Sequence, residues 1–224
     1  MSSHHIIRDK QEPALIIANG EACNADLLGQ LLEWSPFIVV LDGAIKRVLE
    51  LGIKIDVLLG DFDRNELDLD DIRAVQFPIE IIQTPDQNKT DLEKAFDFLI
   101  ERGFPAVNVV WATGRRADHT IANITNIIRY KSKLFITIID DYSVIYPLLP
   151  SPHIYTKWYA KGSTISLIPV GEAHGIKTKN LMYNIDNQSL TLGYQNGNSN
   201  EALSDGLVEI SYQSGDLLLM ECHD

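Results

Sequence analysis

Carboxylate side chains follow three short apolar runs in the first half of the sequence. They are Asp42, Asp61, Asp63, Asp86 and Asp91. Asp61 and Asp63 are two residues apart, so an extended chain points both carboxylates to the same side. Carboxylates that gather in a small volume repel one another unless they bind a cation, and Mg²⁺ is commonly held by one or two carboxylates plus substrate phosphates. A lone Asp-x-Asp pair is more typical of a solvated acidic turn, but Asp42 and Asp91 at parallel positions favour a magnesium site.

A fourth polar segment, Gly114–His119, contributes arginines instead of carboxylates. It opens a predicted helix, and the N–H groups at that helix end, with Arg115 and Arg116 beside them, suit a phosphate anion. Asp118 is also a good N-cap residue, which by itself accounts for its position. His119 is more typical of a hydrogen-bonding partner than of a general base. The sequence has no G-x-x-x-x-G-K-S/T, G-x-G-x-x-G or G-x-S-x-G motif, which excludes a P-loop nucleoside triphosphatase and a typical dinucleotide-binding domain and leaves no nucleophile elbow.

The strands and helices that must position these residues are predicted to form an α/β domain over residues 1–150. Its apolar runs are short, rich in Val and Ile, and typical of strands buried on both faces. The predicted strands are Ala14–Ala18, Phe37–Leu41, Val57–Leu59, Ile79–Ile82, Val107–Trp111 and Leu134–Ile139. The predicted helices begin near Asp26 and cover Ala44–Leu51, Asp91–Arg102 and Asp118–Tyr130. This alternation predicts a mostly parallel, Rossmann-like sheet with helices on both faces, whose ligands bind at the carboxyl ends of the strands.

The pattern changes after Tyr146, where three prolines follow in quick succession and no good helical pattern is found. Alternating segments separated by Gly and Asn turns predict a smaller all-β sandwich or barrel domain. The segments are Ile154–Tyr159, Thr164–Pro169, Leu190–Leu192, Leu207–Tyr212 and Leu217–Met220. We place the domain boundary near residue 150, which gives an α/β domain at 1–150 and a β domain at 151–224.

The charge of the chain is unevenly distributed. Its 224 residues carry a formal net charge of −12. The segment from Asp56 to Asp97 holds twelve acidic and four basic side chains, a local charge of −8. A chain with this excess of negative charge is a poor partner for nucleic acid.

The cysteines and the apolar runs exclude two further kinds of protein. Cys23 and Cys222 are too far apart in the sequence to match the spacing of metal ligands, and no apolar run is long enough to cross a bilayer. We therefore expect a cytoplasmic protein that does not bind membranes.

Four segments resemble, in order and spacing, the motifs of the thiamine pyrophosphokinase family. They are Asp42-Gly43-Ala44, Gly60-Asp61-Phe62-Asp63, Asp86–Ala95 and Gly114–Ile124. Two later segments, Gly175–Tyr183 and Gly197–Glu201, resemble its C-terminal elements, so the likeness covers roughly residues 14–220. The resemblance implies an α/β catalytic domain followed by a β-sandwich that helps to bind thiamine, in a homodimer with thiamine at the interface. It implies transfer of a pyrophosphoryl group from ATP to thiamine, giving thiamine diphosphate and AMP.

The resemblance also implies roles for individual residues. Asp61, Asp63 and Asp91 would hold Mg²⁺ and, with Arg115 and Arg116, would form the catalytic set, while Asp42 and Asp86 would lie close by. Thr90, Arg115, Arg116 and Asp118, with His119 as an additional candidate, would face the nucleotide and its phosphates. Ser199 and Asn200 would lie near the thiamine.

The chain departs from the family pattern at three motifs. Ala44 and Lys46 stand where the family usually has Gly and often has Asn, Asn88 stands at a position that is commonly Asp, and Gly114-Arg115-Arg116 replaces Gly-Gly-Arg. The acidic and arginine motifs describe the ATP half of the site better than the acceptor. A pyrophosphokinase for another alcohol, such as a hydroxymethylpterin, and a non-catalytic nucleotide or thiamine diphosphate sensor therefore remain as alternatives. The Ser199–Asn200 region favours thiamine over a pterin.

Overall fold

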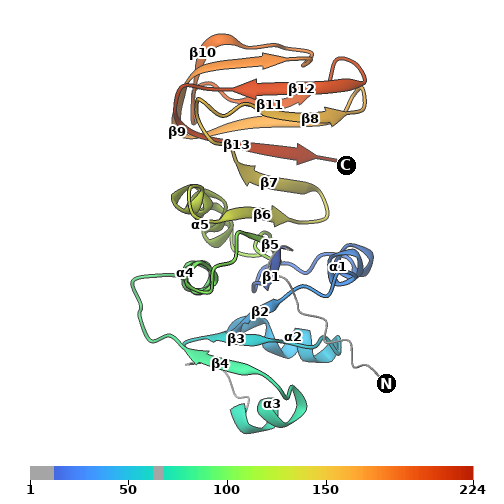
Figure 1. The fold of residues 1–224 in the computed structure, drawn as a ribbon, viewed down its shortest axis with the longest axis vertical. Helices are drawn as coiled ribbons and strands as arrows, with labels where there is room; N and C mark the ends of the chain where they lie inside the picture. The colour runs from blue at the N-terminus through green and yellow to red at the C-terminus, as the bar shows by residue number, and fades with distance from the viewer. Residues whose placement is uncertain (1–12, 63–67, 224) are drawn as a thin grey trace, which may run out of the picture. The chain divides into compact units, whose positions relative to one another are not determined.

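The computed structural model describes residues 13–62 and 68–223, and these divide into two compact units (Figure 1). The division lies between Thr120 and Ile121. The assignment of residues 1–150 and 151–224 to two functional domains stays a prediction. None of the helices in the described ranges combines the length and the apolar character needed to span a membrane.

The first unit is built on five parallel strands. They are β1 (Ala14–Ile17), β2 (Ile38–Leu41), β3 (Val57–Gly60), β4 (Glu80–Gln83) and β5 (Ala106–Val110). Their order is β4-β3-β2-β1-β5, and every neighbouring pair is parallel. Each residue of β1, β2 and β3 is buried, as their apolar sequences require. The expectation of burial on both faces is wrong for β4, whose residues are exposed or half-buried because it lies at the edge of this unit.

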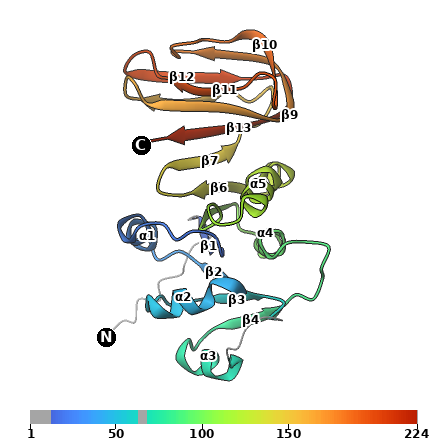
Figure 2. The ribbon, with the colours of Figure 1, turned by 180° about the vertical axis from the view of Figure 1, so that it is seen from behind.

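Helices connect these strands on both sides of the sheet. They are α1 (Ala25–Leu32), the 3₁₀ turn η1 (Asp42–Ala44), α2 (Ile45–Glu50), α3 (Leu69–Val75) and α4 (Asp91–Glu101), and α5 (Ala117–Asn126) continues into the second unit. Figures 1 and 2 show α1 and α4 on opposite sides of β1. The sequence pattern did not predict α3, because Ile72 is the one residue buried in this short helix and its first turn is acidic.

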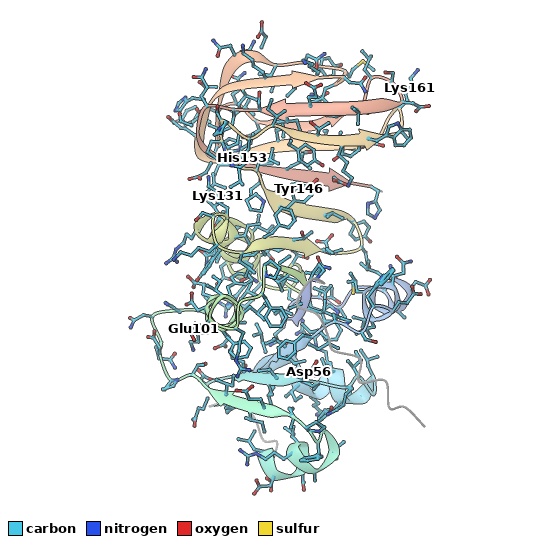
Figure 3. The ribbon with its side chains drawn as sticks, in the orientation of Figure 1. Asp56, Glu101, Lys131, Tyr146, His153 and Lys161 are labelled. Atoms are coloured by element: carbon cyan, nitrogen blue, oxygen red, sulfur yellow. The ribbon has the colours of Figure 1, made fainter. Side chains whose placement is uncertain are left out.

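The second unit is antiparallel. After the 3₁₀ turn η2 (Ile127–Tyr130) its strands are β6 (Phe135–Ile139), β7 (Ser143–Pro147), β8 (Tyr155–Tyr159), β9 (Thr164–Lys179), β10 (Asp186–Thr191), β11 (Gly197–Glu201), β12 (Gly206–Ser211) and β13 (Ser214–Cys222). The strand order is β6-β7-β13-β9-β12-β8, and β10 and β11 also pair with β9. The long strand β9 therefore organises the unit by pairing with four others. Its core includes Tyr146 of β7, which Figure 3 labels.

The predicted order of elements is confirmed at the coarser level of an α/β unit followed by a β unit. The sheet is mixed: the pairs among β1 to β5 are parallel, whereas β6 and β7 form an antiparallel pair within residues 1–150 and the strands after them are antiparallel too. Two strands were not predicted. β7 follows the polar turn after β6, and β11 begins at Gly197, where a Gly and Asn turn was expected.

Candidate active site

The loops that follow the parallel strands meet at one edge of the sheet and are tied to one another by hydrogen bonds. Phe62 N–H donates to Asp42 Oδ2 at 3.1 Å, which joins the β3 loop to the β2 loop. Gln87 Nε2 donates to Asp61 Oδ2 at 3.3 Å, which joins the β4 loop to the β3 loop. Glu21 N–H donates to the Thr113 carbonyl at 2.8 Å, which joins the β1 loop to the β5 loop. This edge is where ligands of parallel α/β sheets bind.

Asp42 is a half-buried carboxylate in the loop after β2. It opens η1 directly after β2. A Cβ atom on Gly60 would lie 2.4 Å from the Asp42 Cγ, so only glycine at the end of β3 allows this approach. Burial raises the pKa of Asp42 above its ordinary value, the N–H of Phe62 lowers it, and the negative charges of Asp91 and Asp61 raise it further. Asp61 and Asp91 therefore lie close enough to Asp42 to act on its carboxylate.

The β3 loop carries Asp61 and a strained neighbour. Phe62 has a φ of +60°, a left-handed conformation that an aromatic residue rarely adopts. Backbone strain of this kind often marks a functional loop. Here it allows the Phe62 N–H to reach Asp42 while Asp61 accepts from Gln87. Asp63, the second carboxylate of the predicted pair, lies outside the described residues.

The β4 loop and the start of α4 place Asp86, Thr90 and Asp91 in different surroundings. Asp86 is exposed, and its Oδ1 accepts from the backbone and side-chain N–H groups of Asn88, both at 2.9 Å. Thr90 forms a capping box with Glu93, so its hydroxyl is already used to begin the helix. Asp91 pairs with the almost fully buried Lys94 at 3.0 Å, and Lys94 also donates to the Thr84 carbonyl at 2.9 Å. Of the three, Asp91 is the one that acts on Asp42.

The two arginines of the predicted phosphate-binding segment have different partners. Arg115 has a φ of +52°, and its Nη1 donates to the Asn19 carbonyl at 3.4 Å. Arg116 instead pairs with Asp118 through two contacts of 3.0 and 2.5 Å on the exposed start of α5. The hydrogen bond from Arg116 holds the pKa of Asp118 at about 2. Asp118 is the second residue of α5 rather than its N-cap, because the helix begins at Ala117, and His119 follows it on the exposed surface.

Ser199 and Asn200 lie in β11 of the second unit. Asn200 is buried, and its side-chain amide accepts from the Tyr183 N–H at 3.1 Å and donates to the Tyr183 carbonyl at 2.8 Å. These bonds fix the 180–184 segment against β11. Ser199 is exposed, with a φ of +56°, and its N–H donates to Ser166 Oγ at 2.9 Å.

The structure adds two residues that sequence reasoning missed, Asn19 and Arg47. Asn19 follows β1, and Arg47 Nη2 donates to its Oδ1 at 2.9 Å and to the Gly20 carbonyl at 3.1 Å. The rule that identified the other loops also applies to the first strand, so the polar sequence Asn19-Gly20-Glu21 was the available signal. Arg47 lies on a helix, and nothing in its local pattern distinguishes it from a surface residue.

The acidic residues of this edge suit a hard divalent cation bound together with phosphate. Within residues 13–62 and 68–223, no three Asp, Glu, His or Cys side chains are gathered closely enough to hold a metal ion by themselves. Mg²⁺ keeps several water or phosphate ligands and needs only one or two carboxylates from the protein. Burial and the negative charges of Asp91 and Asp61 raise the pKa of Asp42, and a bound cation would offset both effects.

Known proteins resemble this chain over both of its units. Residues 28–138 match the family described as "Thiamin pyrophosphokinase, catalytic domain", and residues 152–217 match "Thiamin pyrophosphokinase, vitamin B1 binding domain". Thiamine pyrophosphokinase from Bacillus subtilis is 29% identical over 202 residues, which cover 89% of this chain and 92% of that protein. Thiamine pyrophosphokinase 1 from rice is 31% identical over 157 residues, which cover 65% of this chain and 58% of the rice protein.

Solved structures extend the likeness to the fold. The crystal structure of the Bacillus subtilis thiamine pyrophosphokinase superposes with a TM-score of 0.78 at 26% identity, over 95% of this chain and 100% of that one. The yeast enzyme superposes with a TM-score of 0.81 at 15% identity, over 96% and 88% of the two chains, and supports the fold alone.

Proposed function

The chain belongs to the thiamine pyrophosphokinase family, and on that premise we propose that it transfers a pyrophosphoryl group from ATP to thiamine. The products are thiamine diphosphate and AMP. The observation that carries the proposal is the shared environment of Asp42, Asp61 and Asp91 at the carboxyl edge of the α/β unit. Arg115 follows β5 at the same edge.

The reaction requires attack of the thiamine hydroxyl oxygen on the β-phosphorus of ATP. The new O–P bond forms as the bond between the β-phosphorus and the α,β-bridging oxygen breaks, and that oxygen leaves with AMP while the hydroxyl proton passes to a base or to water. The site must hold nucleophile and leaving group in line and neutralise the triphosphate. No covalent enzyme intermediate is needed.

We propose that Asp61, Asp63 and Asp91 hold Mg²⁺ and that Asp42 and Asp86 lie near it. A bound Mg²⁺ supplies neutralisation of the phosphate oxygens. Lys94 fixes the Asp91 carboxylate, and the Phe62 N–H fixes that of Asp42, so both groups are oriented before a ligand arrives. Arg115 is placed to stabilise negative charge on the phosphates. Arg116, Thr90, Asp118 and His119 stay candidates for nucleotide contacts.

We propose that the acceptor is thiamine, bound with help from the β unit near Ser199 and Asn200. The match of residues 152–217 to a vitamin B1 binding domain favours thiamine over a hydroxymethylpterin. An acidic edge would also favour the approach of cationic thiamine. A homodimer with thiamine at its interface and a cytoplasmic location are further predictions.

Incubation of the full chain with ATP, Mg²⁺ and either thiamine or a hydroxymethylpterin, followed by nucleotide analysis, tests the proposal. We expect AMP and thiamine diphosphate with thiamine and no product with the pterin. Formation of ADP with thiamine monophosphate would rule out pyrophosphoryl transfer. Absence of turnover with either acceptor would favour the sensor alternative.

A further inference from the structure

The guanidinium of Arg47 on α2 contacts the loops that follow β1 and β5. Its Nη2 donates to Asn19 Oδ1 and to the Gly20 carbonyl, which fixes it to the loop after β1. Its Cζ lies 4.5 Å from the centre of the Trp111 ring, at the end of β5. Trp111 is only 1% exposed and has no hydrogen-bond partner for its indole N–H among the described residues. Arg47 is thus stacked on Trp111 and oriented through Nη2, and its half-buried side chain carries further N–H donors that can bind a ligand.

A second guanidinium bonds to the same loop, at the same residue. Arg115 Nη1 donates to the Asn19 carbonyl at 3.4 Å. The φ of +52° at Arg115 follows a φ of +73° at Gly114. Glycine adopts this backbone conformation without steric cost, whereas an L-residue with a side chain pays roughly 1 kcal/mol or more for it. A strained arginine that faces another arginine is a feature that folding alone does not favour.

The two positive charges repel one another. Burial lowers the pKa of Arg47, and the charge of Arg115 lowers it further, while Glu21 acts in the opposite direction. Both guanidiniums stay charged in a protein. Glu21 therefore offsets part of the repulsion between the two guanidiniums.

We propose that Arg47 and Arg115 together form a phosphate-binding subsite at the carboxyl ends of β1 and β5. The proposal rests on the proposed function, because the ligand would be a phosphate group of the ATP polyphosphate. A phosphate between the two guanidiniums relieves their repulsion and takes up the donors of Arg47 that point away from Asn19. Charged hydrogen bonds of this kind are the strongest that arginine makes.

The main test is Arg115→Gly, measured as the dissociation constants of ATP with Mg²⁺ and of inorganic pyrophosphate by calorimetry on the full chain without thiamine. Glycine accepts the backbone conformation, so the melting temperature should not fall. Loss of one charge-assisted contact should weaken both ligands about tenfold or more. Arg73→Ala removes an exposed guanidinium on α3 that pairs with Asp70, and both dissociation constants should stay at the wild-type value.

Arg47→Lys separates binding from a purely structural role. Lysine keeps the charge but loses the planar fork, so affinity for ATP and pyrophosphate should fall and the loss in the double variant should differ from the product of the single losses. If Arg47 only ties the β1 loop in place, the melting temperature falls while both dissociation constants stay within twofold of wild type, and the proposal is overturned. Unchanged affinity in Arg115→Gly, or a wild-type chain that binds neither probe, also overturns it.

A fluorescence measurement places the effect at this corner. Trp34 and Trp158 are exposed, so replacing both by Phe leaves the buried Trp111 as the single indole. Pyrophosphate should change its emission in that background and should not do so after Arg47→Lys. No change in either protein would contradict the subsite. Neither binding assay contains thiamine, so failure of thiamine as the acceptor in the turnover assay is distinguished from failure of the subsite.

Discussion

Three carboxylates from three loops, Asp42, Asp61 and Asp91, share one environment, and their repulsion is retained in the folded chain. Two of them are held by specific donors: the Phe62 N–H holds Asp42, and Lys94 holds Asp91. Such an arrangement costs stability unless a ligand offsets it. At the residue scale, the site is therefore preorganised for a cation and a polyphosphate rather than for stability.

Replacement of Asp91 by Asn tests this reading of the carboxylates. We expect turnover to fall by about 100-fold or more, because the variant loses an electrostatic contact with the reacting groups. The melting temperature should fall, because the buried Lys94 loses its counter-charge, but the chain should still unfold cooperatively. Asp97→Asn on the same helix is the matched control, because Asp97 pairs with Lys89 on the surface, and its turnover should be unchanged. Near wild-type turnover in Asp91→Asn would show that Asp91 is not part of the site.

Sequence reasoning placed Asp42, Asp61 and Asp91 at one edge, because the carboxyl ends of parallel strands share an edge whatever their side chains do. It could not separate the roles of the two arginines. Arg115 turns toward the β1 loop through its left-handed backbone, whereas Arg116 pairs with Asp118. Those outcomes depend on side-chain partners that come together only in the folded chain.

At the scale of elements, the start of α4 decides where Asp91 lies. Thr90 accepts from the Glu93 N–H at 3.3 Å, and the Glu93 carboxylate accepts from the Thr90 N–H at 3.0 Å. Thr90→Ala should lower the free energy of unfolding by about 1 kcal/mol. It should also reduce turnover, because Asp91 is the first residue of the helix. Thr90→Ser keeps the cap and should behave like wild type in urea unfolding. Equal stability of the Ala and Ser variants would refute the capping role.

The half-buried carboxylate of Glu221 joins three strands of the β unit. Glu221 of β13 accepts from Tyr146 of β7 at 2.5 Å, from Tyr159 of β8 at 2.8 Å and from Lys157 at 2.7 Å. Burial raises the pKa of Glu221, but the hydrogen bonds from Lys157 and the tyrosines outweigh it, so the pKa lies below its ordinary value. Burial also raises the pKa of Tyr146, which keeps that hydroxyl protonated as a donor.

This network predicts a pH dependence of stability. Because the folded pKa of Glu221 is lowered, its stabilising contribution is complete above the unfolded value of about 4.3 and is lost as the pH falls through the folded pKa. Urea unfolding from pH 7 to pH 3 should therefore show a smaller acid-induced loss of stability in Glu221→Gln than in wild type. Glu209→Gln, which removes the exposed partner of Lys179, should follow the wild-type curve. Identical pH slopes for Glu221→Gln and wild type would contradict the prediction.

The strands and helices of the first unit could be predicted because apolar runs, caps and glycines signal them locally. α3 could not, because it buries little more than Ile72. β11 could not, because its sequence Gly197–Glu201 is polar and it becomes a strand by pairing with β9. The length of β9 has the same origin, since its partners β12 and β13 are remote in sequence.

At the scale of the whole molecule, two units of different construction divide the chemistry that we propose. The α/β unit carries the acidic edge and the arginines, and residues 152–217 of the β unit match a vitamin B1 binding domain. The proposal also accounts for part of the local charge of −8 between Asp56 and Asp97, because this segment includes loops that would bind Mg²⁺ and ATP. Surface acids such as Asp70 and Asp71 account for part of it.

The most direct test of pyrophosphoryl transfer follows the individual phosphorus atoms of ATP. ATP labelled with ³²P at either the α or the β position is incubated with the full chain, Mg²⁺ and thiamine, and the products are separated by chromatography. The account predicts that the β label moves to thiamine diphosphate and that the α label stays in AMP. Retention of the β label in ADP, or of both labels in unreacted ATP, would contradict it.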